Sequence, residues 1–100
     1  MELLQVFFAG VFMINGIPHL VNGISGKAFM TPFKKPSSPL VNIIWAFVNF
    51  AIGYVILGQS FTLLTTGINF WVFLTGAFLM SLMDASSFAN PNFRFPWQKE

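Results

Sequence analysis

Charged side chains are scarce in this chain: of 100 residues, 8% are charged and 55% are hydrophobic. A soluble domain usually carries about 25% charged residues. A surface with so little charge would not keep a folded chain in water, so membrane lipid is the expected solvent. The aromatic content of 18%, with 14 phenylalanines, indicates the same surroundings.

Cysteine is absent, which excludes disulfides, thiolate metal sites and thiol redox chemistry. The formal net charge of +2 is too small and too scattered for a nucleic-acid-binding surface. Paired carboxylates, a serine–histidine–acid arrangement and a glycine-rich phosphate loop are also missing. A single histidine offers too few ligands for a metal site. We therefore expect no metal and no other cofactor, and an enzyme is the least favoured class of function.

Long uncharged runs take the place of charge in this sequence. A helix needs roughly 20 apolar residues to cross a bilayer, and three uncharged stretches have about that length: residues 3–21, 40–57 and 61–83. The first begins within "MELLQ" and lacks the basic residues of a signal peptide, so we expect it to be retained. The predicted fold is all-α: a single membrane domain, residues 1–100, with three transmembrane helices.

Turn and cap residues mark the ends of these helices. The short "GQS" linker requires the second and third helices to form an antiparallel hairpin, with Gly58 ending one helix and Ser60 capping the next. The longer connection, residues 22–38, ends in Ser38 followed by proline, which is a good helix start. Pro18 removes a backbone donor, so the first helix should bend or end there.

Basic residues occur only in the 22–38 connection and in the tail, residues 84–100. With three transmembrane helices these two segments lie on the same side, which the positive-inside rule places in the cytoplasm, with the N-terminus outside. We expect an integral protein of a bacterial inner membrane. In the tail, Asn90 precedes a proline and should end the helix. Its aromatic and basic residues suit an interfacial anchor in the headgroups or, alternatively, a partner-docking peptide.

Each predicted helix has one side of small and polar residues. Small residues allow two helix backbones to approach closely, and amides can hydrogen-bond across the contact. The helices are therefore expected to meet along these sides. At 100° per residue the sides contain Leu4, Phe8, Val11, Asn15, His19 and Asn22 in the first helix; Asn42, Ala46, Asn49 and Gly53 in the second; and Thr62, Thr66, Asn69, Phe73, Gly76, Met80 and Asp84 in the third.

The polar residues on these sides allow two interpretations. As structural residues they hold the helices in register, at roughly 0.6–2 kcal/mol per contact. As functional residues they form a polar track for a small solute or ion at graded depths. The functional interpretation predicts a ligand-binding set of Asn15, His19, Asn42, Asn49, Asn69 and Asp84.

His19 and Asp84 are expected at about the same depth near the cytoplasmic boundary. If the first and third helices touch, these two side chains could pair, and histidine titrates near neutral pH. A proton-coupled step is then conceivable. The alternative is that His19 is interfacial and wet, while Asp84 only ends the transmembrane stretch.

The segments "INGIPHLVNGISGKAFMTPF" and "WAFVNFAIGYVIL" resemble the start of DoxX-like small membrane proteins. In that family a first helix ends in a Gly-x-x-His-apolar turn, and a second helix carries a polar residue shortly before a glycine. The resemblance implies an accessory or small-ligand role, sometimes beside oxidoreductase systems. The chain departs from the family in having three predicted helices instead of four, and an asparagine where an acid is frequent. The matching positions are Gly16, His19, Leu20, Asn49 and Gly53.

Two functions remain open from the sequence. The leading one is an oligomeric transporter or channel-like protein for a small solute or ion, because three helices enclose little volume and a path forms more easily between subunits. The alternative is a non-catalytic accessory or regulatory subunit of a larger membrane complex, whose polar faces bind a partner helix. Both functions involve membrane lipids, and neither involves a nucleic acid.

Overall fold

The computed structural model describes the whole chain except residues 1, 91, 94 and 98–100. The prediction of an all-α fold is confirmed over the described part, which contains helices and no named strand. Three of the helices are long and apolar enough to cross a membrane. The elements are α1 (Glu2–Ile24), α2 (Pro39–Ile56), the short 3₁₀ helix η1 (Thr62–Thr65) and α3 (Asn69–Ala89).

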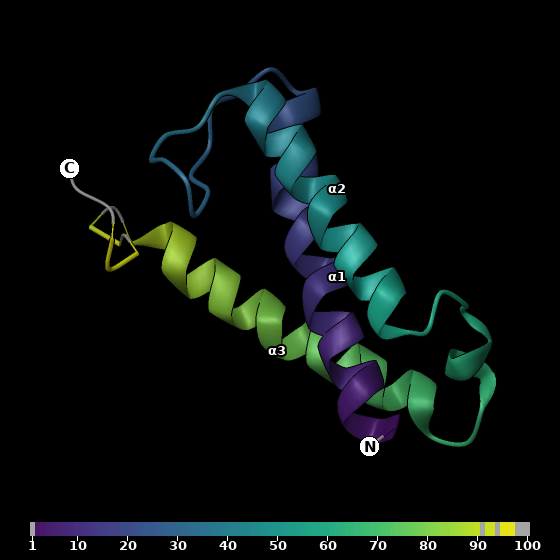
Figure 1. The fold of residues 1–100 in the computed structure, drawn as a ribbon. Coiled ribbons are helices and arrows are strands. Elements are labelled where there is room, and N and C mark those ends of the chain that lie inside the picture. Colours follow the sequence, from purple (N-terminus) through teal and green to yellow (C-terminus); the bar gives the residue numbers. More distant parts are fainter. Residues whose placement is uncertain (1, 91, 94, 98–100) are drawn as a thin grey trace.

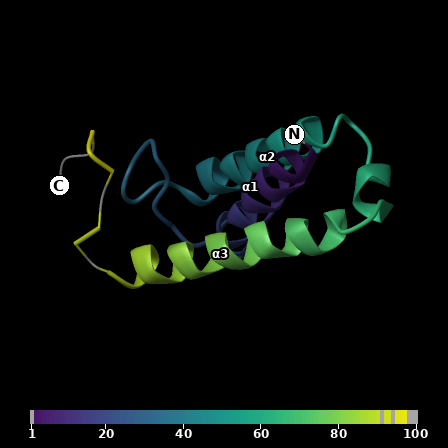
Figure 2. The same ribbon diagram turned by 90° about the horizontal axis from the view of Figure 1, so that it is seen from below.

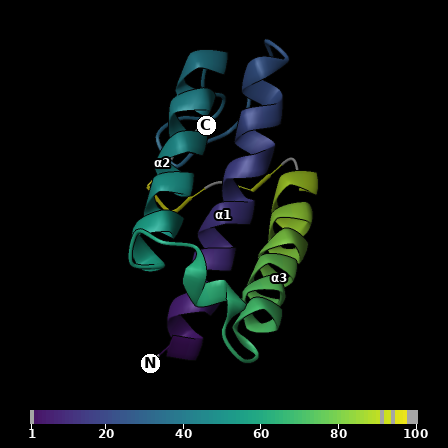
Figure 3. The ribbon, with the colours of Figure 1, turned by 90° about the vertical axis from the view of Figure 1, so that its right-hand side faces the viewer.

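Helix α1 lies between the other two long helices (Figures 2 and 3) and packs against both of them. Helix α2 runs antiparallel beside α1, whereas α3 crosses α1 and then diverges from it toward the C-terminus (Figure 1). The molecule is elongated, with extents of 45 × 23 × 23 Å. The end at which α3 diverges is also the end that carries the connection between α1 and α2.

Several predicted helix ends are confirmed. The Ser38 hydroxyl accepts a hydrogen bond from the Val41 amide at 3.2 Å and caps α2, whose first residue is the proline that follows. Gly58 follows the end of α2 with a φ of +76°, a conformation that favours glycine. Asn90 is extended, as expected before a proline, and ends α3.

The predicted bounds of the third helix, residues 61–83, are wrong at both ends, since α3 starts and finishes later. The early part instead forms η1, because hydroxyl groups there compete for backbone partners. Ser60 accepts from the Thr62 amide at 3.2 Å, and Thr65 donates to the Thr62 carbonyl at 2.7 Å. The prediction that Ser60 caps the third helix is therefore wrong: its hydroxyl makes a local turn just before η1, and Ile68 precedes α3. Gly67, with a φ of +55°, turns the chain before α3 begins.

Helix α1 does not end at Pro18 but continues to Ile24. One glycine before the proline and one after it allow this part of α1 to pack closely against α2. A Cβ atom added at Gly16 or at Gly23 would meet an α2 backbone oxygen at 2.9 Å. The Pro18 carbonyl also accepts a hydrogen bond from the Asn22 amide at 2.8 Å. Packing against α2 thus keeps the chain helical where the proline alone would favour a break.

The predicted small and polar sides are confirmed for α2 and only in part for the other helices. In α1 the predicted stripe includes Leu4 and Phe8, which are 49% and 47% exposed. Helix α1 packs against α2 on one face and α3 on another, so its buried residues do not follow a single stripe. In α3, Asn69 and Gly76 are buried. All four predicted residues of α2 are buried: Asn42, Ala46, Asn49 and Gly53.

The closest approach between α1 and α3 is a contact of backbone with backbone. A Cβ atom added at Gly10 would lie 2.1 Å from the Phe73 carbonyl oxygen, and one added at Gly76 would lie 2.2 Å from the Phe7 carbonyl oxygen. Real Cβ contacts are never this short, and the obstructing atoms are backbone atoms that cannot rotate away. Both positions therefore require glycine.

We expect Gly76→Ala to lower the free energy of unfolding by about 1–3 kcal/mol, the usual cost of added bulk in a packed contact. The substitution forces α3 away from α1, which can be measured by graded denaturation in mixed detergent micelles. Ala51→Leu is the control, because residue 51 is exposed on α2 and added bulk there meets no helix. Equal stabilities of the two variants would contradict the contact.

Candidate functional site

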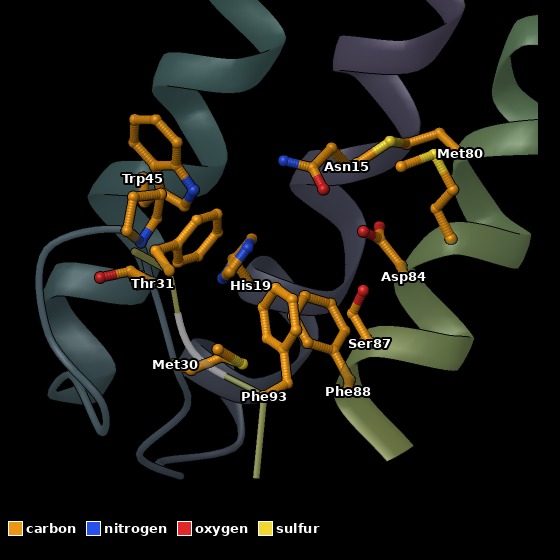
Figure 4. A pocket seen from close by; sticks show the side chains of 13 residues that line it. Asn15, His19, Met30, Thr31, Trp45, Met80, Asp84, Ser87, Phe88 and Phe93 are labelled. Atoms are coloured by element: carbon orange, nitrogen blue, oxygen red, sulfur yellow. The ribbon is translucent and has the colours of Figure 1, made fainter. Parts of the chain in front are cut away.

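A cavity of about 240 Å³ lies at the end of the molecule where α3 diverges from α1. All three long helices, the connection between α1 and α2, and the described tail residues line it. Figure 4 shows Trp45 of α2 and Asp84 of α3 on opposite sides, with Asn15 and His19 of α1 between them. Three residues of the predicted ligand-binding set thus meet in one place.

Asn42 fixes the connection that closes one side of the cavity. Its side-chain nitrogen donates to the carbonyls of Phe29, Ser37 and Ser38 at 2.9, 3.2 and 3.0 Å. Its side-chain oxygen lies 2.8 Å from Nδ1 of His19. One buried amide therefore satisfies three backbone carbonyls of an irregular segment and a ring on the neighbouring helix. Irregular backbone near lipid needs such partners.

These contacts determine the tautomer of His19. Because the Asn42 nitrogen faces three carbonyls, its oxygen must be the atom that faces Nδ1, and Nδ1 must donate the proton. A neutral ring then has its lone pair on Nε2, and no described residue hydrogen-bonds that atom. The side chain is 2% exposed, so it is buried and not the wet interfacial histidine of the alternative prediction. Its ring packs against Phe29 and Phe88, with centroids 5.5 and 6.0 Å away.

A second chain of amides crosses all three helices. The Asn49 nitrogen donates to the Trp45 carbonyl at 2.9 Å, and the Asn49 oxygen accepts from the Asn15 nitrogen at 3.1 Å. The other end of the Asn15 amide lies 3.0 and 3.1 Å from the two carboxyl oxygens of Asp84. His19 and Asp84 do not pair with each other, because each has its own asparagine.

Trp45 presents an unused donor at this site. Its indole nitrogen is buried and has no hydrogen-bond partner among the described residues, although the ring lines the cavity. The ring is held edge-on by Phe33, with centroids 5.1 Å apart. An acceptor atom inside the cavity would satisfy this donor, and an unsatisfied buried donor costs about 1–3 kcal/mol.

Aromatic and methionine side chains form the remaining walls. The described tail folds back over the cavity: Lys35 donates to the Phe93 carbonyl, and the Trp97 indole donates to the Pro32 carbonyl at 2.6 Å. The aromatic tail was predicted to be an interfacial anchor or a docking peptide. Its described residues instead lie against the connection between α1 and α2 of the same chain. Arg94 and Lys99 lie outside the described residues. The apolar lining includes Met30, Met80, Met83, Phe88, Phe93 and Phe95.

The predicted set of six residues separates into three groups. Asn15, His19 and Asp84 line the cavity, whereas Asn42 and Asn49 stand behind them and orient them. Asn69 lies at the opposite end of the molecule. Its nitrogen donates to the carboxylate of Glu2 at 3.0 Å and to the Leu63 carbonyl at 2.9 Å.

Several lining residues were not predicted from the sequence. Trp45 lies three residues after Asn42 and four before Asn49, and Ser87 lies three after Asp84, so helical periodicity was a usable signal for both. Phe93 and Phe95 carried no such signal, because only the folded tail brings them to the cavity. Among the described residues, no group of three or more histidine, cysteine or acidic side chains could hold a metal ion.

Comparison with known proteins gives no relative: no protein-family model, curated protein or solved structure matches the chain. The resemblance to DoxX-like proteins therefore rests on the quoted residues alone. The function has to be argued from the cavity itself.

We expect Asn42→Ala to release the connection between α1 and α2 while leaving the helices intact. Three carbonyls and His19 lose their partner, so cleavage by trypsin after Lys27 and Lys34 should accelerate about tenfold or more, with unchanged helical circular dichroism. Each tenfold change corresponds to about 1.4 kcal/mol of local opening.

Asn69→Ala is the matched control, because it removes an equally buried amide at the far end and should leave the connection protected. Equal acceleration in both variants would show a global loss of stability instead of local release.

Proposed function

We propose that this protein is an integral membrane protein that binds a small solute in the cavity and moves it across the bilayer. The cavity lies at the loop end of the molecule, the end that carries the connection between α1 and α2. The observation that carries the proposal is the convergence of polar atoms without partners at the end of three apolar helices. The Trp45 indole nitrogen and Nε2 of His19 have no hydrogen-bond partner among the described residues, and both residues line the cavity. An apolar cavity with a few convergent polar groups is the usual form of a small-molecule site.

The proposed orientation places the cavity on the cytoplasmic side, as in a bacterial inner-membrane protein. The basic residues of the connection, Lys27, Lys34 and Lys35, flank this end, and cytoplasmic segments carry the excess of lysine and arginine. The N-terminus is then outside. The solute would bind from the cytoplasm or leave toward it.

The proposal includes an oligomer, because the described residues of one chain are closely packed beyond the cavity. Toward the outer end the interior is closed by the glycine contact between α1 and α3 and by an apolar cluster of Val6, Ala9 and Leu57. A solute crossing the membrane therefore requires α3 to move, or a path between two copies of the chain.

A second candidate function, an accessory subunit, is favoured by the packing of α3. Only Asn69 and Gly76 of this helix are buried, so most of its surface is free to face lipid, a second copy or a larger partner. Capture of one copy with a larger membrane protein would favour this candidate.

The proposal is tested by native mass spectrometry of the protein released gently from its membranes. We expect a homo-oligomer that retains a small molecule, and transport of that molecule into liposomes that contain the protein. Ser87→Phe should fill the cavity and lower both retention and transport at least tenfold, because residue 87 lines it. Ser86→Phe is the matched control. Ser86 is exposed and does not line the cavity, so the same added bulk should change neither retention nor transport. Equal effects of the two variants, or no retained molecule, would contradict solute binding in this cavity.

A further inference from the structure

We propose that the solute is a small organic cation and that it enters the cavity in exchange for one proton held by Asp84. This inference rests on the proposed solute-binding function and names the class of solute. It combines three observations: the charge of the lining, the aromatic walls, and the orientation of the amides that reach Asp84.

The described lining contains one carboxyl group and no lysine or arginine. Asp84 is that group, and His19, from α1, is the only other titratable side chain that faces the cavity in the described part. Helix α2 contributes Trp45, and the connection and the described tail contribute only uncharged lining side chains. Lys35, outside the lining, is directed to the Phe93 carbonyl. An ionised Asp84 therefore has no cationic partner among these residues, and the cavity offers a cation its counter-charge.

The walls suit a weakly hydrated cation. Phe88, Phe93, Phe95 and Trp45 come from three different parts of the fold and all line the same cavity. A cation over an aromatic face gains about 0.5–2 kcal/mol, and alkylated ammonium groups are the usual ligands of such aromatic cages. The volume of about 240 Å³ lies below the roughly 300–1,000 Å³ of sites for drug-sized molecules. The solute should therefore be small, with a single ring or a few alkyl groups.

The amide chain indicates what Asp84 holds when the cation is absent. Because the Asn49 nitrogen is used on the Trp45 carbonyl, the Asn49 oxygen faces Asn15 and takes the Asn15 nitrogen. The Asn15 oxygen is then directed at the carboxyl oxygens of Asp84, at 3.0 and 3.1 Å. Two acceptors at this distance need a proton between them. A protonated Asp84 that donates to the Asn15 oxygen completes every hydrogen bond of the chain.

An ionised Asp84 requires the opposite orientation. Turning the Asn15 amide over lets its nitrogen donate to both carboxylate oxygens. Its oxygen then faces the Asn49 oxygen, and turning Asn49 as well would direct that oxygen at the Trp45 carbonyl. The ionised form therefore leaves one repulsive contact in the chain, and a bound cation compensates by pairing with the carboxylate.

The exchange conserves charge and atoms. The O–H bond of Asp84 breaks, the proton leaves to water, and the carboxylate pairs with the incoming cation. The net charge of the cavity stays the same before and after. Since an unpaired charge in an apolar site is costly, proton and cation should compete for Asp84.

The test uses the full chain in lipid nanodiscs and three probes of similar size: phenyltrimethylammonium, its uncharged isostere tert-butylbenzene, and benzoate. The charge of phenyltrimethylammonium does not depend on pH, so any pH dependence belongs to the protein. By calorimetry in buffers of different ionisation enthalpy, we expect this probe alone to bind, with release of one proton per cation. Its affinity should rise up to tenfold per pH unit while Asp84 is protonated.

Asp84→Asn should lower the affinity for phenyltrimethylammonium at least tenfold and abolish the proton release. Glu2→Gln is the control, because it makes the same acid-to-amide change at the opposite end and should alter neither quantity. Asp84 is the only aspartate in the chain, so a ¹³C label on the aspartate carboxyl reports on it in unmodified protein. Its NMR signal should change from acid to carboxylate on addition of phenyltrimethylammonium and not on addition of tert-butylbenzene.

Three outcomes would overturn the inference. Equal binding of the uncharged probe or of benzoate would show a different class of solute. Proton release that persists in Asp84→Asn would assign the titration to His19. A carboxylate signal in the empty protein would show that Asp84 holds no proton to exchange. In each case a solute retained by the wild type and lost in Ser87→Phe would leave the proposed function standing, whereas loss of all retention would remove both.

Discussion

At Gly10 and Gly76 the backbones of α1 and α3 come closer than any larger side chain would allow. The position of this contact determines where α1 and α3 are tightly packed and where they leave room for the cavity. It lies in the first half of both helices, and α3 is inclined to α1, so the two separate toward the loop end (Figure 1). The cavity occupies that wedge, roofed by the connection and the described tail. A larger residue at the crossing would change the width of the wedge without touching the site.

The two interpretations of the polar residues apply to different residues. Asn42 has a structural role: its nitrogen donates to three backbone carbonyls and its oxygen contacts Nδ1 of His19. That bond also leaves the lone pair of the neutral His19 ring on Nε2, an atom that no described residue hydrogen-bonds. Asn49 acts in the same way on Asn15. Register and site are therefore produced by the same hydrogen bonds, with the buried asparagines of α2 directing the side chains of α1.

Periodicity predicted the parts of the fold that depend on one helix at a time. The buried side of α2 follows from small and polar residues at helical spacing, and the caps at Ser38 and Gly58 follow from local chemistry. The stripe of α1 could not be predicted fully, because a central helix has two partners and its buried faces depend on both. The passage of α1 through Pro18 depends on close packing of its glycines with α2, which a sequence pattern does not contain.

Three of the residues that line the cavity were predictable for a related reason. Asn15, His19 and Asp84 are unusual in apolar helices, so composition alone marks them as functional candidates. Their partners were not predictable: a pairing of His19 with Asp84 at equal depth was one possibility from the sequence, whereas in the structure His19 contacts Asn42 and Asp84 contacts Asn15. The tail residues Phe93 and Phe95 reach the cavity only because backbone carbonyls of the connection and the tail accept bonds from Trp97 and Lys35.

The two carboxyl groups of the described chain show how a third residue changes the chemistry of a pair. At the end of the molecule opposite the cavity, the Asn69 nitrogen donates to the carboxylate of Glu2, and its remaining proton goes to a backbone carbonyl. At the loop end the Asn15 nitrogen is already used on Asn49, so the same type of side chain presents its oxygen to Asp84. An asparagine beside an acid thus serves as a donor in one place and requires a proton in the other. The difference lies in Asn49 of α2, which takes the Asn15 nitrogen and so turns the Asn15 oxygen toward Asp84. The chemistry of an acid beside an amide therefore depends on the second partner of that amide.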